Sequence, residues 1–392
     1  MADDEPRPPA LMKILLLGAG ETGKSTILKQ ISLLYGQKES LGLYKEWLQR
    51  NTLTSAKQLV KVCRALKPDL LSGAADEAAA VEAADVEQSV TPELAAAMAK
   101  LWASGPLKEA RLANFATPTE WVPDQAPYFL ENATRLCAAS YEPEDADSLR
   151  ARTLTVGVKS VEFADKVDGA YLMQHLPIAA QVIEGSDIPS LCQLDWQMID
   201  VGGQRNERRK WLHALSDAKA LVWTAGLSEY QQVLYEDPSK IRMLESLELF
   251  EKWANNAQFA QTPIVVVFTK KDLFEANWDE ASFKKVFPEW VPGADAKASA
   301  IAYLKEQFLA KLKAQRERPT FYTLDLTDAD QVSELVKEIK RIVAAHNSGY
   351  IMDFIASFKK KKESGADGKR RGSAIAEGLK RLSLGGRRDS KK

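Results

Sequence analysis

The sequence contains few cysteines and no long apolar run. Its three cysteines lie far apart in the 392-residue chain, at Cys63, Cys137 and Cys192. That spacing excludes a paired disulfide framework and a zinc site, so we expect a reducing, cytoplasmic environment. No stretch approaches the ~20 apolar residues that cross a bilayer, and the acidic, proline-rich start is unlike a secretory signal. We therefore expect neither a signal peptide nor a transmembrane helix.

An excess of charge of one sign is also lacking. The 53 Lys and Arg residues nearly balance the 54 Asp and Glu residues, which gives a formal net charge of −1. This balance gives no reason to expect nucleic acid as a partner. Hydrophobic residues make up 45% of the chain and charged residues 27%, a composition typical of a globular protein with a large core.

Basic residues are nevertheless concentrated near the C-terminus. Residues 359–392 contain 13 Lys or Arg and 4 Asp or Glu, a local formal charge of +9. We therefore expect residues 347–392 to form a basic, disordered extension. Ser373, Ser383 and Ser390 follow basic residues in a spacing that suits basophilic kinases. The tail is either a plain solubilising end or a peripheral contact with anionic lipid at the inner face of the plasma membrane, weakened by phosphorylation.

Apolar runs that alternate with helical patterns predict a doubly wound α/β sheet. Residues 11–17, LMKILLL, form a continuous apolar run that ends at Gly18, as in a buried parallel strand. The other strand-like runs cover residues 156–163, 191–200, 220–225, 264–268 and 321–326.

An all-helical insertion interrupts this alternation. From about Gly36 to Arg150 the sequence is rich in Ala and Leu with helical periodicity and has almost no β-branched runs. We expect an α/β domain over residues 11–36 and 151–346, with a helical domain over residues 37–150 inserted into it.

The strongest single motif is a glycine-rich loop between the first predicted strand and a predicted helix. Residues 18–25 read GAGETGKS, a complete G-x-x-x-x-G-K-S pattern. In such a loop the backbone N–H groups face phosphate oxygens, Lys24 reaches the β and γ phosphates, and Ser25 is a Mg²⁺ ligand. The motif predicts a nucleoside triphosphate site but does not select the base.

A second motif, DVGGQ over residues 200–204, directly follows a predicted strand. An Asp at a strand end, here Asp200, holds Mg²⁺ directly or through water in phosphate-loop proteins. Gly203 lets its N–H group approach the γ-phosphate closely, and Gln204 is suited to position the attacking water. Alone, this string is also compatible with a plain tight turn. Its pairing with the phosphate loop favours the functional interpretation.

Two further motifs are weaker when taken alone. Residues 149–155, LRARTLT, lie where the helical insertion returns to the sheet, and a cation there neutralises charge on a transferred phosphoryl group. Residues 269–272, TKKD, follow an apolar strand, and the carboxylate of Asp272 can accept from both N1–H and the exocyclic amine of guanine. Arginines in a linker and charged residues directly after a strand are common. Both motifs therefore support a nucleotide site only in combination with GAGETGKS and DVGGQ.

Together the motifs resemble those of the α subunits of heterotrimeric G proteins. GAGETGKST, LRART, DVGGQRNERRKW, LSEYQQVLYEDPSKIRMLESLELFEKWANN and FTKKDLF occur in that family's order and nearly its spacing, over roughly residues 12–345. The resemblance implies a P-loop GTPase fold of the Ras-like type with an inserted helical domain, and an enzyme that hydrolyses GTP to GDP and phosphate. A nucleoside kinase or ATPase is disfavoured, because DVGGQ and the Lys270, Asp272 pair have no role there.

The resemblance also implies roles for single residues. Arg152 would be the catalytic arginine supplied in cis, for which this family is itself the standard example, and Gln204 would orient the water. Ser25 and Thr155 would bind Mg²⁺. Segments 150–158 and 202–212 would be the switches. Contacts with GTP or GDP would come from Glu21, Thr22, Gly23, Lys24, Ser25, Thr26, Leu149, Arg150, Asp200, Gly203, Thr269, Lys270, Asp272 and Leu326.

The base pocket departs from the family pattern at two positions. Thr269 stands where the family has Asn in N-K-x-D, and its short hydroxyl is not expected to bridge the base and the phosphate loop. Asp325 places a negative charge in the loop that reads T-C-A-T in the family. Both departures predict weaker base binding and faster nucleotide release. The alternative function is therefore a weakly binding or fast-exchanging interaction module with little turnover.

The resemblance implies three partners, namely a G-protein βγ dimer, a G protein-coupled receptor and an effector. About 25 residues near 166–189 are additional to the family pattern, only about 10 residues precede the first strand, and the chain runs on past Ala345. We expect the binding of βγ and of receptors to be the functions that these differences affect.

Overall fold

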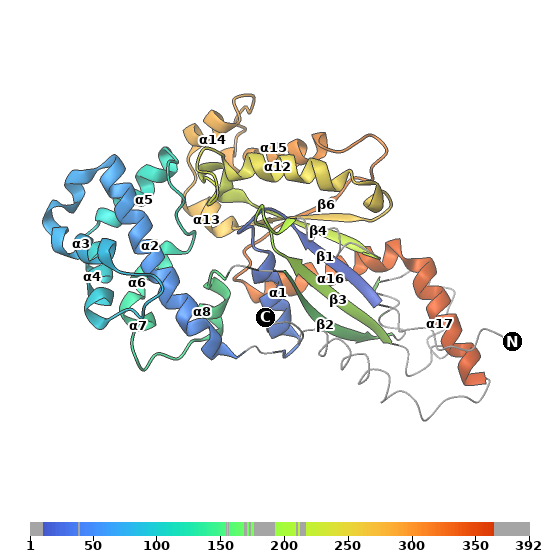
Figure 1. Ribbon diagram of the computed structural model, residues 1–392. Coiled ribbons are helices and arrows are strands. Elements are labelled where there is room, and N and C mark those ends of the chain that lie inside the picture. The colour runs from blue at the N-terminus through green and yellow to red at the C-terminus, as the bar shows by residue number, and fades with distance from the viewer. Residues whose placement is uncertain are drawn as a thin grey trace, which may run out of the picture. The chain divides into compact units, whose positions relative to one another are not determined.

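Figure 1 shows the computed structural model of the chain. It describes residues 11–37, 40–153, 155, 157–167, 171, 174–175, 193–208, 211 and 217–363. The chain divides into two compact units. The larger is formed by residues 12–163 and 196–343, and the smaller by residues 1–11, 164–195 and 344–392. All the residues of the candidate site belong to the larger unit.

A six-stranded sheet has the strand order β2-β3-β1-β4-β5-β6. The pairs β1–β4, β4–β5 and β5–β6 are parallel, and every residue of β4 and β5 is buried, as expected for continuous apolar strands with neighbours on both sides. Each strand lies where the apolar pattern predicts one, with small shifts at the ends. The bounds are β1 Leu11–Leu17, β2 Val158–Lys166, β3 Gln193–Val201, β4 Ala220–Gly226, β5 Ile264–Thr269 and β6 Thr320–Thr323.

The parallel strands bring the glycine-rich loop and the loop after β5 to one edge of the sheet. Strand β1 leads into the glycine-rich loop and then into α1 (Lys24–Leu34), and β5 leads into α13 (Lys271–Ala276). In parallel sheets the loops that follow the strands meet at the same edge, which is where ligands bind. The remaining helices of this part are α12 Arg242–Ala254, α14 Glu280–Val286, α15 Ala296–Ala310 and α16 Ala329–His346.

The helical segment between α1 and β2 has a hydrophobic core of its own. Figure 1 shows its helices gathered around the long helix α2, whose buried side chains include Leu53, Leu59 and Val60. Pro92 and Pro106 occupy the first positions of α4 and α5, where a missing N–H group costs nothing. The helices are α2 Tyr44–Leu66, α3 Ala75–Ala83, α4 Pro92–Ala103, α5 Pro106–Ala116, α6 Ala126–Glu131, α7 Ala133–Leu136 and α8 Asp145–Arg150.

The C-terminal region differs from the expected disordered extension. Ser348–Glu363 form a helix, α17, in which Ile351 and Ile355 are buried. The expectation of disorder from residue 347 rested on the lysines at its end, whereas the apolar residues that precede them have helical spacing. Most of the insertion near 166–189 and residues 364–392 lie outside the described part of the chain. No described helix is both long and apolar enough to cross a membrane.

Candidate functional site

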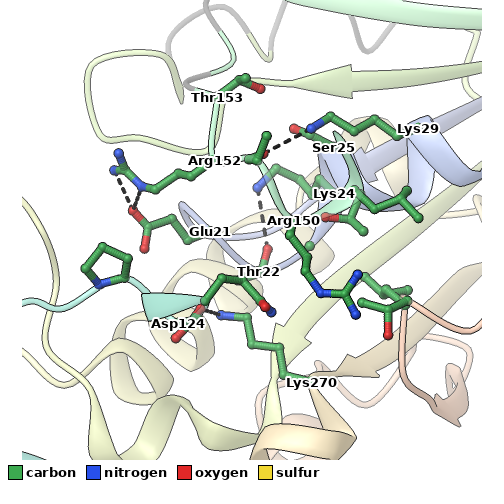
Figure 2. Close-up of a pocket in the computed structure, with 18 of the residues that line it drawn as sticks. Glu21, Thr22, Lys24, Ser25, Lys29, Asp124, Arg150, Arg152, Thr153 and Lys270 are labelled. Carbon is green, nitrogen blue, oxygen red and sulfur yellow. Dashed lines mark hydrogen bonds and ion pairs between the residues drawn. The ribbon is translucent and has the colours of Figure 1, made fainter. Parts of the chain in front are cut away.

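A cavity lies at the edge of the sheet that carries the glycine-rich loop, and helical-segment residues complete its wall (Figure 2). Of the residues that the sequence singled out for nucleotide, metal or catalysis, all line this cavity except Asp200 and Thr269, which are fully buried. The lining consists of residues 20–26, 29, 123–125, 129, 149–153, 155, 203–204, 270, 272–273 and 325–327.

The glycine-rich loop ends at the N-terminus of α1, with Gly23 in the left-handed region at φ 98°. A Cβ atom at Gly23 would lie 2.5 Å from Leu326 Cδ1, so only glycine fits. Lys24 Nζ donates to the carbonyl oxygens of Gly18 (3.0 Å) and Ala19 (2.5 Å). Burial lowers the pKa of Lys24 to about 8, although nearby carboxylates act in the opposite direction. The loop therefore holds a buried cation with donors suited to phosphate oxygens.

Three oxygen-bearing side chains converge beside this loop. Ser25 Oγ donates to Asp200 Oδ2 (2.5 Å) and lies 2.7 Å from Thr155 Oγ1, which is 3.2 Å from the same carboxylate oxygen. The other oxygen, Asp200 Oδ1, is buried and has no hydrogen-bond partner among the described residues. Burial raises the pKa of Asp200, even though Lys24 and Ser25 favour its charged form. Two hydroxyls and a carboxylate with one unsatisfied oxygen form a donor set that suits Mg²⁺.

Gly203 and Gln204 follow β3 and face the glycine-rich loop. A Cβ atom at Gly203 would lie 2.5 Å from Ala19 O, so the absence of a side chain allows this close approach. Turned to match its neighbours, the Gln204 amide donates to Glu236 Oε2 (3.1 Å). Arg208 Nε donates to Gly203 O (3.0 Å) and holds this backbone. Glu236 is a partner for Gln204 that the sequence did not suggest.

Arg152 pairs with a residue of the glycine-rich loop. Its Nε donates to Glu21 Oε1 (2.6 Å), and its guanidinium lies over the rings of Trp121 (4.6 Å) and Tyr235 (5.3 Å). Figure 2 shows the two charged side chains facing each other. Burial raises the pKa of Glu21, but Arg152 and Arg242 outweigh it and lower the pKa below its ordinary value. The Glu21 carboxylate is therefore charged at neutral pH.

A buried ionic cluster connects the helical segment to the end of β5. Lys270 Nζ lies 2.5 Å from Asp124 Oδ2 and 2.9 Å from Glu229 Oε1. Arg242, which is 2% exposed, donates to Glu229 Oε1 (2.7 Å) and Glu21 Oε2 (3.3 Å). Burial raises the pKa of Asp124, but the charges of Lys270 and Arg242 outweigh burial, lower the pKa below its ordinary value and keep the carboxylate charged. Each charge is thus compensated, as buried charges require.

The predicted base side of the cavity contains Asp272, Asp325 and Leu326. Burial raises the pKa of Asp272, and the negative charge of Asp325 raises it further. The Asp325 carboxylate also accepts from Thr327 N (2.8 Å). Gln30 Nε2 donates to Leu326 O (2.9 Å), which ties this loop to α1. Asp325 thus lines the cavity together with Asp272.

The hydroxyl of Thr269 reaches the glycine-rich loop, since Thr269 Oγ1 donates to Thr22 O (2.9 Å). The expectation that it does not also reach the base stays a prediction. Strand β4 lies between β1 and β5, so the bond reaches Thr22 in the loop that follows β1 and not β1 itself. Thr269 does not line the cavity, so any effect on base binding has to be transmitted through this bond.

Several residues of the site escaped the sequence analysis. Lys29 lines the cavity and holds the end of α8. Arg150 of that helix, which was predicted, packs over the Tyr128 ring (4.6 Å). Asp124 gave no signal, since no motif surrounds it. Glu229 and Arg242 lie in the long segment that resembles the G-protein family, but nothing in the residue pattern assigned them a role. Their pairing depends on side chains that are far apart in sequence.

Comparisons with known proteins agree with this geometry. A model of the G-protein alpha subunit family matches residues 2–343. A Guanine nucleotide-binding protein G(o) subunit alpha from Locusta migratoria is 34% identical over 86% of this chain and 89% of the relative. The G(o) subunit alpha of Caenorhabditis elegans is 33% identical over the same shares, and the alpha-17 subunit of Caenorhabditis briggsae is 31% identical over 84% and 87%. The chain therefore belongs to the G-protein alpha subunit family, and is a GTP-binding, GTP-hydrolysing subunit that transduces signals.

Proposed function

We propose that the cavity binds GTP and GDP together with Mg²⁺ and transfers the γ-phosphoryl group to water. The observation that carries this proposal is the convergence of Ser25, Thr155 and Asp200 beside a buried lysine in a glycine-rich loop. These groups provide an anion site and a cation site in contact with each other, which is the requirement for a metal-bound triphosphate.

Residues 21–26 would hold the phosphates through backbone N–H groups and the Lys24 ammonium. Ser25 and Thr155 would hold Mg²⁺, and Asp200 would accept hydrogen bonds from the ligands of the ion. The bound ion would neutralise charge on the phosphate oxygens. The present bonds of these hydroxyls to Asp200 orient their oxygens toward one point. Leu149 and Arg150 would complete the nucleotide contacts from the end of α8.

Gln204 and Arg152 would perform the chemistry. Gln204 orients the attacking water, and the Arg152 guanidinium stabilises the charge that develops on the phosphoryl oxygens. In the structure both side chains have other partners, namely Glu236 and Glu21. The reaction therefore requires each side chain to exchange its partner, and segments 150–158 and 202–212 would be the switches that allow it.

Asp272 would accept the guanine N1–H and amine, with Lys270 and the Leu326 backbone on the same side. Lys270, at φ 57°, is held by Asp124 and Glu229. Thr269 would support the base site indirectly, through its hydrogen bond to Thr22 in the glycine-rich loop. A guanine preference follows from the Asp272 carboxylate, because adenine lacks the donor pair.

The partners would be a βγ dimer, a G protein-coupled receptor and an effector, in keeping with the family. We further propose that the basic tail, residues 359–392, contacts anionic lipid at the inner face of the plasma membrane, at ~1 kcal/mol for each basic residue near the surface. Sedimentation with vesicles of phosphatidylserine and phosphatidylcholine tests this contact. Removal of residues 359–392 should abolish sedimentation, and sedimentation that persists without them contradicts it.

Binding of a fluorescent, non-hydrolysable GTP analogue with Mg²⁺ tests the site. We expect competition by GTP and not by ATP, loss of single-turnover hydrolysis in Gln204→Leu, and loss of hydrolysis on chelation of Mg²⁺. Equal competition by ATP would contradict the role of Asp272, and normal hydrolysis by Gln204→Leu would contradict that of Gln204. Weak analogue binding with no turnover in the unmodified protein would favour the interaction module.

A further inference from the structure

Arg152 lies in an irregular segment between the end of α8 at Arg150 and the start of β2 at Val158. Backbone groups in such a segment have no regular partners and need others. Both polar groups of the Arg152 backbone are nevertheless bonded to one side chain. Asn51 Oδ1 accepts from Arg152 N (2.6 Å), and Asn51 Nδ2 donates to Arg152 O (3.1 Å). The amide of Asn51 thus clamps this backbone at two points.

Asn51 is well anchored for this purpose. It is 7% exposed and belongs to the 23-residue helix α2, which packs at the centre of the helical segment. The two bonds also fix the orientation of the amide, because its oxygen faces a donor and its nitrogen faces an acceptor. A planar amide bonded at both ends prevents rotation of the backbone that one bond would allow.

A second anchor holds the residues immediately before Arg152. Lys29 Nζ donates to the carbonyl oxygens of Ser148 (2.8 Å) and Ala151 (3.0 Å). Lys29 belongs to α1, the helix that starts at the glycine-rich loop. The Arg152 backbone is therefore fixed with respect to both the helical segment and the loop that would hold the phosphates.

The Arg152 side chain is held by a different set of contacts. The guanidinium bonds Glu21 and packs over Trp121 and Tyr235, and its side chain remains 22% exposed. Since the clamp acts only on the backbone, rotation about side-chain bonds can release Glu21 without moving the Cα atom. The clamp and the charged pair are thus independent constraints on one residue.

We propose that Asn51 is a positioning residue that keeps the Arg152 backbone in place while the guanidinium moves from Glu21 to the transferring phosphoryl group. The inference rests on the proposed catalytic role of Arg152. Without the clamp the backbone samples other positions, and the guanidinium spends less time where charge develops. Small misplacements of a catalytic group can cost up to ~100-fold in rate.

Asn51→Ala, Asn51→Asp, Arg152→Ala and the double variant Asn51→Ala/Arg152→Ala provide the test. Single-turnover hydrolysis at saturating GTP, the affinity for a non-hydrolysable GTP analogue and the thermal midpoint are measured for each. Asn51→Asp keeps the acceptor for Arg152 N and loses the donor to Arg152 O. Asn255→Ala is the matched control, because Asn255 likewise bonds Lys311 O (2.8 Å) and Lys313 N (2.9 Å), but these partners do not line the cavity, whereas Arg152 does.

We expect Asn51→Ala to hydrolyse GTP roughly 10- to 100-fold more slowly with an analogue affinity within about threefold of the unmodified protein. Asn51→Asp should be intermediate, and Asn255→Ala should hydrolyse normally even where its thermal midpoint falls. The double variant should be no slower than Arg152→Ala, because the clamp acts through that residue.

Two results would overturn the role of Asn51 but not that of Arg152. One is normal hydrolysis by Asn51→Ala while Arg152→Ala is slow. The other is a double variant that is slower than Arg152→Ala by the same factor by which Asn51→Ala is slower than the unmodified protein. Normal hydrolysis by Arg152→Ala instead overturns the catalytic role of Arg152, and with it the inference. The single arginine variant therefore separates failure of the proposed function from failure of the clamp.

Discussion

The hydroxyl of Thr269 donates a hydrogen bond to the backbone carbonyl of Thr22 across 2.9 Å, and thereby joins the end of β5 to the glycine-rich loop. Both side chains are fully buried, so water cannot replace this bond. The contribution of this bond to the site can be tested by substitution.

Replacement of Thr269 by Val keeps the shape of the side chain and removes the hydroxyl. Thr22 O then loses a buried donor, which costs about 1 kcal/mol or somewhat more in the free energy of unfolding. We expect a lower thermal midpoint and a release of fluorescent GDP that is faster by about fivefold, the factor to which 1 kcal/mol corresponds. Thr269→Ser, which retains the hydroxyl, is the control. Equal release rates in both variants would show that the bond does not support the site.

Substitution of Asp325 by Asn should strengthen nucleotide binding. The negative charge of Asp325 opposes both the phosphates and ionised Asp272, while an Asn oxygen can still accept from Thr327 N. We expect roughly fivefold tighter binding of GDP, from removal of ~1 kcal/mol of repulsion. Asp330→Asn, at an exposed position outside the cavity, should leave affinity unchanged. A gain that is the same at low and high salt would contradict the electrostatic explanation.

The same substitution has a consequence for pH dependence. Guanine binding uses the ionised form of Asp272, whose pKa is raised by burial and by Asp325. As pH falls, affinity is lost from a higher pH than an ordinary Asp would give, and in Asp325→Asn the loss should begin at a lower pH. The affinity for the GTP analogue, measured between pH 4.5 and 7, checks this prediction. If affinity falls over the same pH range in the unmodified protein and in Asp325→Asn, Asp325 does not affect the pKa of Asp272.

Nucleotide binding should take up a proton in mildly alkaline solution. Burial lowers the pKa of Lys24 to about 8, and bound phosphate favours its charged form and raises that pKa again. Affinity for GTP therefore falls as pH rises above about 8. The stability of the protein without nucleotide depends on pH in the opposite direction. Between pH values of about 8 and 10.5 Lys24 is protonated in the unfolded chain but not in the folded one, so its contribution to the free energy of unfolding rises with pH.

Titration calorimetry in buffers of different ionisation enthalpy measures this proton uptake directly. The uptake should be small at pH 6.5 and approach one proton near pH 9. Lys24→Arg retains a charge that does not titrate in this range, so any binding it retains should proceed without uptake. Uptake that is independent of pH in the unmodified protein would assign the proton to another group.

Loss of the Asp124 charge should accelerate GDP release. Asp124 bonds Lys270 (2.5 Å) and Gln232 (2.6 Å), so a helical-segment residue holds part of the predicted base site. Asp124→Asn leaves Lys270 with less compensation, and we expect release about tenfold faster, since disturbing a buried charge pair costs more than 1 kcal/mol. Glu82→Gln, which breaks an exposed pair with Arg64 in the same segment, should have little effect. Similar rates in both variants would contradict the role of this contact.

Much of the molecule could be predicted because its signals are local. The apolar run at Leu11–Leu17, the GAGETGKS loop and the DVGGQ turn each combine a strand with the residues that follow it, and their spacing is visible in the chain. Parallel strands then bring those loops to one edge without further information. The helical insertion is equally visible, since helical periodicity persists through a segment without β-branched runs.

The C-terminal region was harder to predict, because charge and helical propensity point in different directions there. The lysines at the end of Ser348–Glu363 indicate solvent exposure, but Ile351 and Ile355 are spaced to bury one helical face. Composition averaged over the segment concealed that spacing. A shorter window would have separated the apolar half from the basic half.

The sequence by itself determined the sheet, the glycine-rich loop and the chemical groups available to the cavity, because these depend on short-range patterns. Only the tertiary structure decided which groups act as pairs. The members of three pairs, Asn51 and Arg152, Asp124 and Lys270, and Thr22 and Thr269, are separated by many residues, and each pair forms only in the folded chain. Hydrogen bonds and ion pairs depend on distances of a few ångströms, which no local pattern in a chain can specify.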